Sequence, residues 1–328
     1  VYCNNGYKSN CAINLRKKKY TGAEGLMNIN FMRLRKIAIS ISVILFFSSI
    51  GSIFMKGLSL GLDFSGGTLV EIQYEDSVNL EEIRNVLSEN GYEDFQVVNY
   101  GSSLDVLIKI ADQPGNSSLG DQIFTLLSSN EFEGELKRIE FVGPQIGSEL
   151  RDQGGLGMLV ALGMILLYVA FRFQYKFALG AVAALGHDVV IILGLFSIFA
   201  WDFDLSVLAA LLAVIGYSLN DSIVVSDRIR ENFRSERALA PEELINLSLN
   251  QTLSRTIITS FTTLLVLFAL FFFGGDAVRG FSLGLIIGVL IGTYSSLYIV
   301  TTILISLNLS QEDMAIPDVE GAEFDDMP

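Results

Sequence analysis

Asp221 is the residue whose type and position most strongly suggest chemistry. It lies within residues 205–226, a run that carries no other charged side chain and is long enough to cross a bilayer. An ionised carboxylate near the centre of such a helix costs roughly 2.5–3.5 kcal/mol on insertion scales. Because a bound proton removes that charge, the position predicts a membrane-embedded carboxyl group that binds and releases protons. A helix-packing or snorkelling acid near the interface is the less favoured alternative.

Arg255 is the candidate partner of Asp221. It opens the fifth apolar run, and its distance from the cytoplasmic side is expected to match that of Asp221 on the fourth run. An ion pair would hold Asp221 ionised, and protonation would release Arg255, which makes a two-state electrostatic switch. An ordinary positive anchor at the membrane surface is an equally good interpretation of Arg255.

Other polar side chains also interrupt the apolar runs. His187, the single histidine of the chain, and Asp188 lie near the middle of the third run. Such a pair is typical of proton relays, but also of hydrogen bonds that hold membrane helices together. The packing role is slightly favoured for His187, and both roles remain open for Asp188. Asn220 and Tyr217, beside Asp221 and one turn before it, are further relay or packing candidates.

Six apolar runs predict six transmembrane helices. They cover residues 37–55, 154–171, 177–200, 205–226, 256–273 and 280–307. Each is close to or longer than the roughly 18 residues that mark a membrane span. Basic residues gather at alternate connections, in residues 33–36, 172–176 and 228–237. The positive-inside rule then places both termini in the cytoplasm and the long polar segment after the first run on the outer side.

The polar segment after the first run predicts a small α+β domain. Strands are expected at residues 68–74, 95–100, 104–110 and 136–142, and helices at 79–90, with Asn79 as its N-terminal cap, and at 118–129. The order βαββαβ is that of a ferredoxin-like domain. This segment contains no histidine, cysteine or nucleotide-binding loop, so the protein is not expected to be an enzyme or to hold a cofactor or metal. The net charge of −14 argues against nucleic acid as a partner.

Changes in composition suggest the domain boundaries. We expect an N-terminal extension at residues 1–26 before a natural start at Met27 or Met32, a cytoplasmic N-terminus with the first span at 27–56, the outer domain at 57–150, the other spans at 151–308 with a cytoplasmic loop at 227–253, and an acidic cytoplasmic tail at 309–328.

Three smaller features lead to further expectations. Pro241 should begin a short amphipathic helix that lies along the membrane surface. Four glycines spaced four residues apart should pack tightly against another helix; they are Gly280, Gly284, Gly288 and Gly292. Asp202 and Asp204, in the connection between the third and fourth runs, are expected to be merely solvated.

Five ordered motifs resemble those of SecF proteins in the SecD/SecF family of protein-export membrane proteins, part of the resistance-nodulation-division superfamily. They are residues 61–68 (GLDFSGGT), 142–147 (VGPQIG), 186–189 (GHDV), 215–232 and 254–256 (SRT). The first contains the family signature residues Gly61, Asp63, Phe64, Gly66 and Gly67. The resemblance covers about residues 28–308.

The resemblance implies a function beyond what the residues alone indicate. The chain would pair with SecD in the bacterial inner membrane, among its lipids, and use the proton-motive force to assist unfolded preproteins through the SecYEG channel after insertion by SecA. Asp221 would be the proton-titrating carboxylate and Arg255 its functional partner, with another acid supplied by SecD. Repacking of the spans could then tilt the outer domain.

Two other functions remain as alternatives. One is a proton-coupled exporter subunit for small molecules or lipids, of the resistance-nodulation-division type. The other is an assembly scaffold without transport, in which Asp221 and Arg255 form a structural ion pair.

Overall fold

The computed structural model describes residues 29–99, 102–110, 118–130, 132–236 and 239–314. The expected extension at residues 1–26 and most of the expected tail at 309–328 lie outside the described residues.

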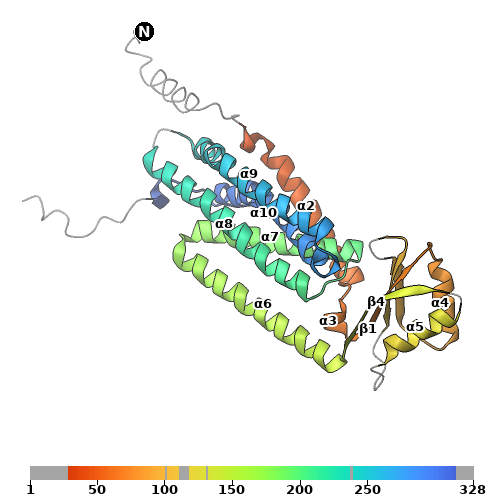
Figure 1. Ribbon diagram of the computed structural model, residues 1–328. Helices are drawn as coiled ribbons and strands as arrows, with labels where there is room; N and C mark the ends of the chain where they lie inside the picture. The colour runs from red at the N-terminus through yellow and green to blue at the C-terminus, as the bar shows by residue number, and fades with distance from the viewer. Residues whose placement is uncertain (1–28, 100–101, 111–117, 131, 237–238, 315–328) are drawn as a thin grey trace, which may run out of the picture. The chain divides into compact units, whose positions relative to one another are not determined.

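Six long helices form the main part of the described chain (Figure 1). They are α2 (Phe31–Lys56), α6 (Pro144–Arg172), α7 (Tyr175–Phe199), α8 (Leu205–Ser235), α9 (Pro241–Phe273) and α10 (Asp276–Ser306). All six are long and apolar enough to cross a membrane. A helix satisfies its own backbone hydrogen bonds, which is the condition for a segment to lie in hydrocarbon. The six predicted spans are thus confirmed as helices, and the protein is a multi-pass membrane protein.

The expectation of a separate short helix at Pro241 is wrong. Pro241 is the first residue of α9, which continues unbroken to Phe273 because no glycine or proline follows within it. The helix α8 also runs past its apolar part to Ser235. The polar ends of α8 and α9 are joined by hydrogen bonds, such as that from Asn232 Nδ2 to Ser248 Oγ at 2.7 Å. Leu244, Ile245 and Leu249, apolar residues that follow Pro241, are fully buried.

The chain divides into two compact units. The helical unit comprises Val1–Lys56, Met164–Leu195 and Ala210–Pro328. The sheet unit comprises Gly57–Gly163 and Phe196–Ala209. The connection between α7 and α8, with the first residues of α8, thus belongs to the same unit as the sheet.

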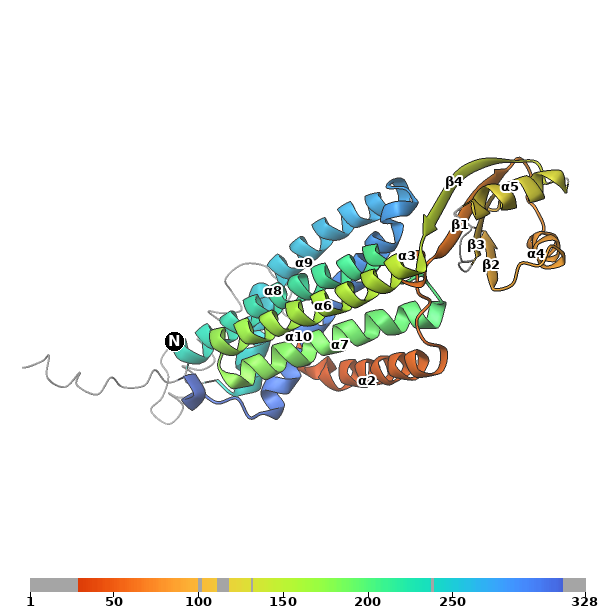
Figure 2. The same ribbon diagram turned by 90° about the horizontal axis from the view of Figure 1, so that it is seen from below.

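The sheet unit contains one four-stranded antiparallel sheet. Its strands are β1 (Gly67–Tyr74), β2 (Phe95–Asn99), β3 (Asp105–Ile110) and β4 (Gly134–Val142), and they lie in the order β2-β3-β1-β4. Figure 2 shows the strands in this order, with β1 between β3 and β4. The helices α4 (Leu80–Glu89) and α5 (Leu119–Ser129) follow β1 and β3 along the chain, so the element order is the expected one.

The alternation of apolar residues determines which face of the sheet is buried. Val70 and Ile72 of β1 lie opposite Ile108 and Val106 of β3, and all four are buried with the inner faces of α4 and α5. Side chains two residues apart in a strand share a face, so this register places the apolar side chains against both helices. The predicted cap of α4 is confirmed, since the Asn79 side chain accepts a hydrogen bond from the backbone of Glu81.

Small residues allow close packing in the helical unit. Gly288 and Gly292 of α10 lie against Val214 and Ser218 of α8, where an added Cβ at either glycine would meet those side chains. The expectation of tight packing is therefore confirmed for these two glycines, and the helix that they contact is α8 of the same chain. This contact brings the polar side chains of α8 and α10 together.

Candidate functional site

Asp221 lies in the interior of the helical unit, between α8, α9 and α10. Asp221 is only 8% exposed. Thr256 of α9 donates a hydrogen bond from Oγ1 to Asp221 Oδ1 at 2.8 Å, and Ser296 of α10 donates from Oγ to Oδ2. Both carboxyl oxygens thus have a hydroxyl partner, each from a different neighbouring helix. The Asp221 carboxyl group of α8 is thus hydrogen-bonded to both α9 and α10.

Arg255 forms no direct ion pair with Asp221 in the part of the chain that the structure describes. The Arg255 side chain is exposed, whereas its neighbour Thr256 turns inward and is buried. Consecutive residues of a helix point about 100° apart, so only one of the two can face Asp221. The direct pairing considered from the sequence is therefore replaced by hydroxyl groups.

Asp188 is a second buried carboxyl group and is only 1% exposed. Its Oδ2 accepts hydrogen bonds from Ser218 Oγ of α8 at 2.6 Å and from Ser295 Oγ of α10 at 2.8 Å. Its Oδ1 lies 3.0 Å from Nδ1 of His187. The imidazole in turn is parallel to the ring of Phe46 of α2, with centroids 6.4 Å apart. The pair considered as relay or packing residues is thus placed in a hydrogen-bonded network that links α7, α8 and α10, with a ring contact to α2.

Two consecutive serines of α10 connect the two acids. Ser295 donates to Asp188 and Ser296 to Asp221, and both serines are fully buried. A shift of this turn of α10 would therefore change the hydrogen bonds of both carboxyl groups together. Sequence reasoning missed these serines. The signal available for them was a pair of hydroxyl residues in the middle of an apolar span, where polar groups need partners.

Tyr217 and Asn220 differ in their surroundings. The Tyr217 hydroxyl donates to Ser260 Oγ at 3.2 Å, and Ser260 is 2.7 Å from Thr293 Oγ1, so a short polar chain joins α8, α9 and α10 one turn away from Asp221. The side chain of Asn220 is exposed. The structure thus brings Tyr217 near the site, while Asn220 points away from it.

The signature residues Gly61, Asp63, Phe64, Gly66 and Gly67 are all in the sheet unit, not among the buried acids. Gly66 and Gly67 have φ values of 70° and 126°, which favour glycine at the entry to β1. Asp63 accepts a hydrogen bond from the backbone of Leu205, the first residue of α8. The signature therefore lies at the start of the helix that carries Asp221.

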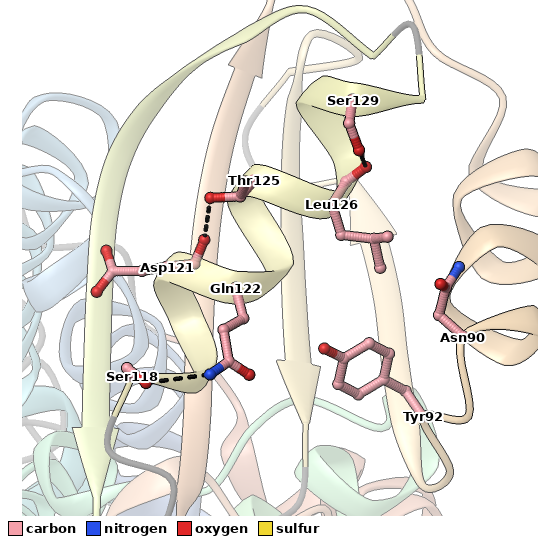
Figure 3. A pocket seen from close by; sticks show the side chains of 8 residues that line it. All are labelled: Asn90, Tyr92, Ser118, Asp121, Gln122, Thr125, Leu126 and Ser129. Atoms are coloured by element: carbon pink, nitrogen blue, oxygen red, sulfur yellow. Dashed lines mark hydrogen bonds between the residues drawn. The ribbon is translucent and has the colours of Figure 1, made fainter.

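The sheet unit also has an open hollow of about 470 Å³, beside α5 (Figure 3). Tyr92 and Asn90, which follow α4, face Leu126 and Gln122 of α5 across it. Its lining offers one carboxyl group, that of Asp121, and no histidine or cysteine. The hollow has no pair of groups suited to acid–base chemistry. Across the described residues, no cluster of three His, Cys, Asp or Glu side chains is arranged to hold a metal ion.

Comparison with known proteins identifies the family. Residues 122–310 match the family model described as protein export membrane protein SecD/SecF, C-terminal, and residues 51–78 match the SecD/SecF GG motif. The protein translocase subunit SecF of Pseudomonas aeruginosa is 52% identical over 92% of this chain and 98% of the relative. The subunit of the same name from Vibrio alginolyticus is 47% identical over 92% of this chain and 97% of the relative.

A solved structure supports the same relationship. The crystal structure of SecDF from Thermus, a translocon-associated membrane protein, superposes with a TM-score of 0.77 and 39% sequence identity over 85% of this chain. The chain spans 38% of that longer SecDF chain. The matches cover both the sheet unit and the helices that hold the two buried acids. The chain belongs to the SecD/SecF family of protein export membrane proteins.

Proposed function

We propose that this chain is a protein translocase subunit that couples the proton-motive force to protein export. It works with a SecD subunit, assists preproteins through the SecYEG channel after SecA-driven insertion, and is not itself an enzyme. Family membership supports this, since the two SecF relatives match this chain over nearly their full length. The SecDF chain, of which this chain spans 38%, supports a partner that supplies the remaining part.

The observation that carries the proposal is the environment of Asp221. Its carboxyl group is buried between three helices, both oxygens accept from hydroxyl groups, and no cationic side chain among the described residues touches it directly. A carboxylate without a contacting cation can take up a proton without breaking an ion pair. A hydroxyl group can also reverse its role, because it both donates and accepts.

Ser296 is well placed for such a reversal. Its hydroxyl oxygen lies 2.9 Å from the carbonyl oxygen of Thr293, so it has a second acceptor in its own helix. When Asp221 binds a proton and becomes a donor, Ser296 turns its hydrogen to Thr293 and accepts from Asp221. Protonation then changes the contact between α8 and α10 by the rotation of one hydroxyl group. Arg255, exposed one residue before Thr256, responds to the change of charge through space.

We further propose the arrangement relative to the membrane. The four-stranded unit is a ferredoxin-like domain on the outer side, and both termini are cytoplasmic. The basic residues at the ends of α6 and α8 support this orientation, in particular Arg172, Arg230 and Arg234. The sheet order β2-β3-β1-β4 with two helices supports the domain assignment.

The test is gradient-driven export in inverted membrane vesicles. We expect Asp221→Asn and Arg255→Met to abolish the part of preprotein export that depends on the proton gradient, while the part driven by ATP remains. Asp227→Asn and Arg234→Met, both in the polar end of α8, make the same chemical changes and are the matched controls. Both should retain export. Full gradient-dependent export by both Asp221→Asn and Arg255→Met would refute the proposal. Normal protein export combined with lost efflux of a small molecule would favour an exporter instead.

A further inference from the structure

Residues 59–67, which include the signature residues and form the signature segment, make a continuous set of contacts with the connection between α7 and α8. Ser59 accepts from the backbone N–H of Phe203 at 2.7 Å, and Gly61 donates to the carbonyl oxygen of Phe203 at 2.8 Å. Leu60 and Phe203 form a parallel β-bridge between these bonds. The segment that leads into the sheet is thus paired, backbone to backbone, with the residues just before α8.

Gly61 is required by the closeness of this pairing. A Cβ atom at residue 61 would lie 2.8 Å from Cβ of Asp204 and 3.3 Å from the carbonyl oxygen of Phe203. Contacts below 3.0 Å between such atoms force one of the backbones to move. The glycine therefore permits a contact that any larger side chain would push apart.

Asp63 joins this segment to the first turn of α8. Its Oδ2 accepts from the backbone N–H of Leu205 at 3.0 Å. The first N–H groups of a helix have no partner within the helix, and a carboxylate there also interacts favourably with the helix dipole. Asp204 caps the same helix end separately, because its Oδ1 accepts from Val207 N–H at 2.8 Å. Two carboxyl groups thus bind the start of α8, one from the connection itself and one from the signature segment.

The rest of the signature fixes the segment to the sheet. Phe64 is 5% exposed, and its ring stacks on that of Phe203 with centroids 6.0 Å apart. Gly66 and Gly67 then turn the chain directly into β1, the strand that pairs with both β3 and β4. The segment therefore leads directly into an inner strand of the sheet.

A second set of contacts also joins the sheet to the connection between α7 and α8. Lys109 of β3 forms an ion pair with Asp202, whose other oxygen accepts from Ser59 Oγ at 3.2 Å. Asp202 and Asp204, expected to be merely solvated, instead bind the sheet and cap the helix. The connection between α7 and α8 is thus held by β3 as well as by the signature segment.

The helix α8 extends from these contacts to the buried acid. It is one continuous helix without proline, and Asp221 lies 16 residues after Leu205, about 24 Å along the axis. Leu205, at the contacts with the sheet unit, and the buried Asp221 thus belong to one helix.

We propose that the signature segment is a clamp that couples α8 to the outer sheet, with Asp63 as its positioning residue. Gly61 permits the close pairing, Asp63 holds the first turn of α8, and Gly66 and Gly67 lead the clamp into β1. A movement of α8 that follows proton binding at Asp221 then moves the sheet. This inference rests on the proposed proton coupling and specifies how the coupling reaches the outer domain.

The test measures movement of the sheet in the complete complex with its SecD partner, reconstituted in lipid. Cys3 and Cys11 are replaced by serine, and spin labels are attached at Glu89→Cys on α4 and Leu290→Cys on α10. The distance distribution between the labels is recorded in acidic and in neutral buffer. We expect a shift in the otherwise unchanged chain and less than half of that shift in Asp63→Ala.

Two further variants separate coupling from stability. Asp63→Asn keeps an oxygen acceptor for the Leu205 N–H group and should restore most of the shift. Asp204→Ala removes a cap from the same helix end but keeps the link from the signature segment, so it should lower stability and leave the shift intact. A merely structural role of Asp63 would make Asp63→Ala and Asp204→Ala behave alike.

The outcomes distinguish this inference from the proposed function. A full shift in Asp63→Ala, or a loss of shift in Asp204→Ala equal to that in Asp63→Ala, would overturn the clamp. If Asp221→Asn abolishes gradient-driven export but the labels do not move in the unchanged chain, the clamp is overturned and the proposed function stands. If export in the unchanged chain does not depend on the gradient, both are overturned.

Discussion

Replacement of Asp188 should separate a hydrogen-bonding role of this acid from a charge-carrying one. Asp188 joins α7 to α8 and α10 by accepting from Ser218 and Ser295 on a single oxygen, Oδ2. Asp188→Ala removes both bonds. It leaves the Ser218 hydroxyl, which has no other hydrogen-bond partner in the described chain, without an acceptor. Asp188→Asn can place its amide oxygen at the Oδ2 position and keep both bonds.

The expected loss of unfolding free energy follows from these contacts. Hydrogen bonds between membrane helices contribute about 0.6 kcal/mol on average and at most about 1.7 kcal/mol. Two such bonds, with the void left by the carboxyl group at a site only 1% exposed, give a cost of about 1–3 kcal/mol for Asp188→Ala. Asp188→Asn should cost less than about 1 kcal/mol, because only the contact with His187 changes in kind.

The assay is unfolding of the purified chain in mixed micelles by titration with SDS. Helix content is followed by circular dichroism, and Trp201, the single tryptophan, provides a fluorescence signal from the connection between α7 and α8. Asp121→Ala, a substitution at an exposed site on α5, is the control and should change stability by less than about 0.5 kcal/mol.

Two results would refute this reasoning. One is an Asp188→Ala variant that unfolds at the SDS fraction of the unchanged chain. The other is an Asp188→Asn variant as unstable as Asp188→Ala, since the hydrogen bonds would then not be the source of the stability. If Asp188→Asn is stable but loses gradient-driven export, Asp188 carries a proton or charge in addition to holding the helices together.

Two further predictions concern packing and pH. Gly288→Ala should destabilise the helical unit by about 1–3 kcal/mol, because the new Cβ meets the Val214 side chain; Gly163→Ala, where nothing lies within 4 Å, should be neutral or slightly stabilising in the same SDS titration, and equal costs for both would contradict the packing argument. Burial alone would raise the pKa of Asp313, but hydrogen bonds from Lys176 and Ser310 outweigh it and lower the pKa below its usual value of about 3.9. Because the folded-state pKa is the lower one, the ionised carboxylate stabilises the fold above about pH 4, and this contribution is lost as the pH falls through the folded-state value. Asp313→Asn should therefore be less stable than the unchanged chain at neutral pH and equally stable in strong acid, in thermal unfolding across pH; a difference that persists in strong acid would contradict this assignment.

Much of the fold was predictable because its signals are local. A span needs a long apolar run whatever its neighbours are, so all six helices could be located from hydropathy. The element order of the sheet unit followed from alternation and from caps such as Asn79. The helix at Pro241 was misjudged because polarity suggested a surface segment, whereas its apolar side chains are buried and Ser248 is hydrogen-bonded to Asn232 of α8.

The candidate site was predictable only in part. Asp221 and Asp188 were visible in the sequence because charge in an apolar run is costly wherever it occurs. Their partners were not visible, since Thr256, Ser218, Ser295 and Ser296 are ordinary residues of membrane helices until the packing is known. Arg255 was considered as a partner because of its charge, with a membrane-surface anchor as an equal alternative, yet the rotation of α9 turns Thr256 inward instead.

The sequence by itself determined that the described part of this chain has six helices long and apolar enough to cross a membrane, and that two carboxyl groups lie within their apolar runs, because hydropathy and charge act residue by residue. Only the tertiary structure decided what those carboxyl groups touch and what the signature segment does. Hydrogen-bond partners depend on helix rotation, and the tie between Asp63 and Leu205 joins residues far apart in the chain. Neither is encoded in any local pattern, because each depends on how separate elements pack.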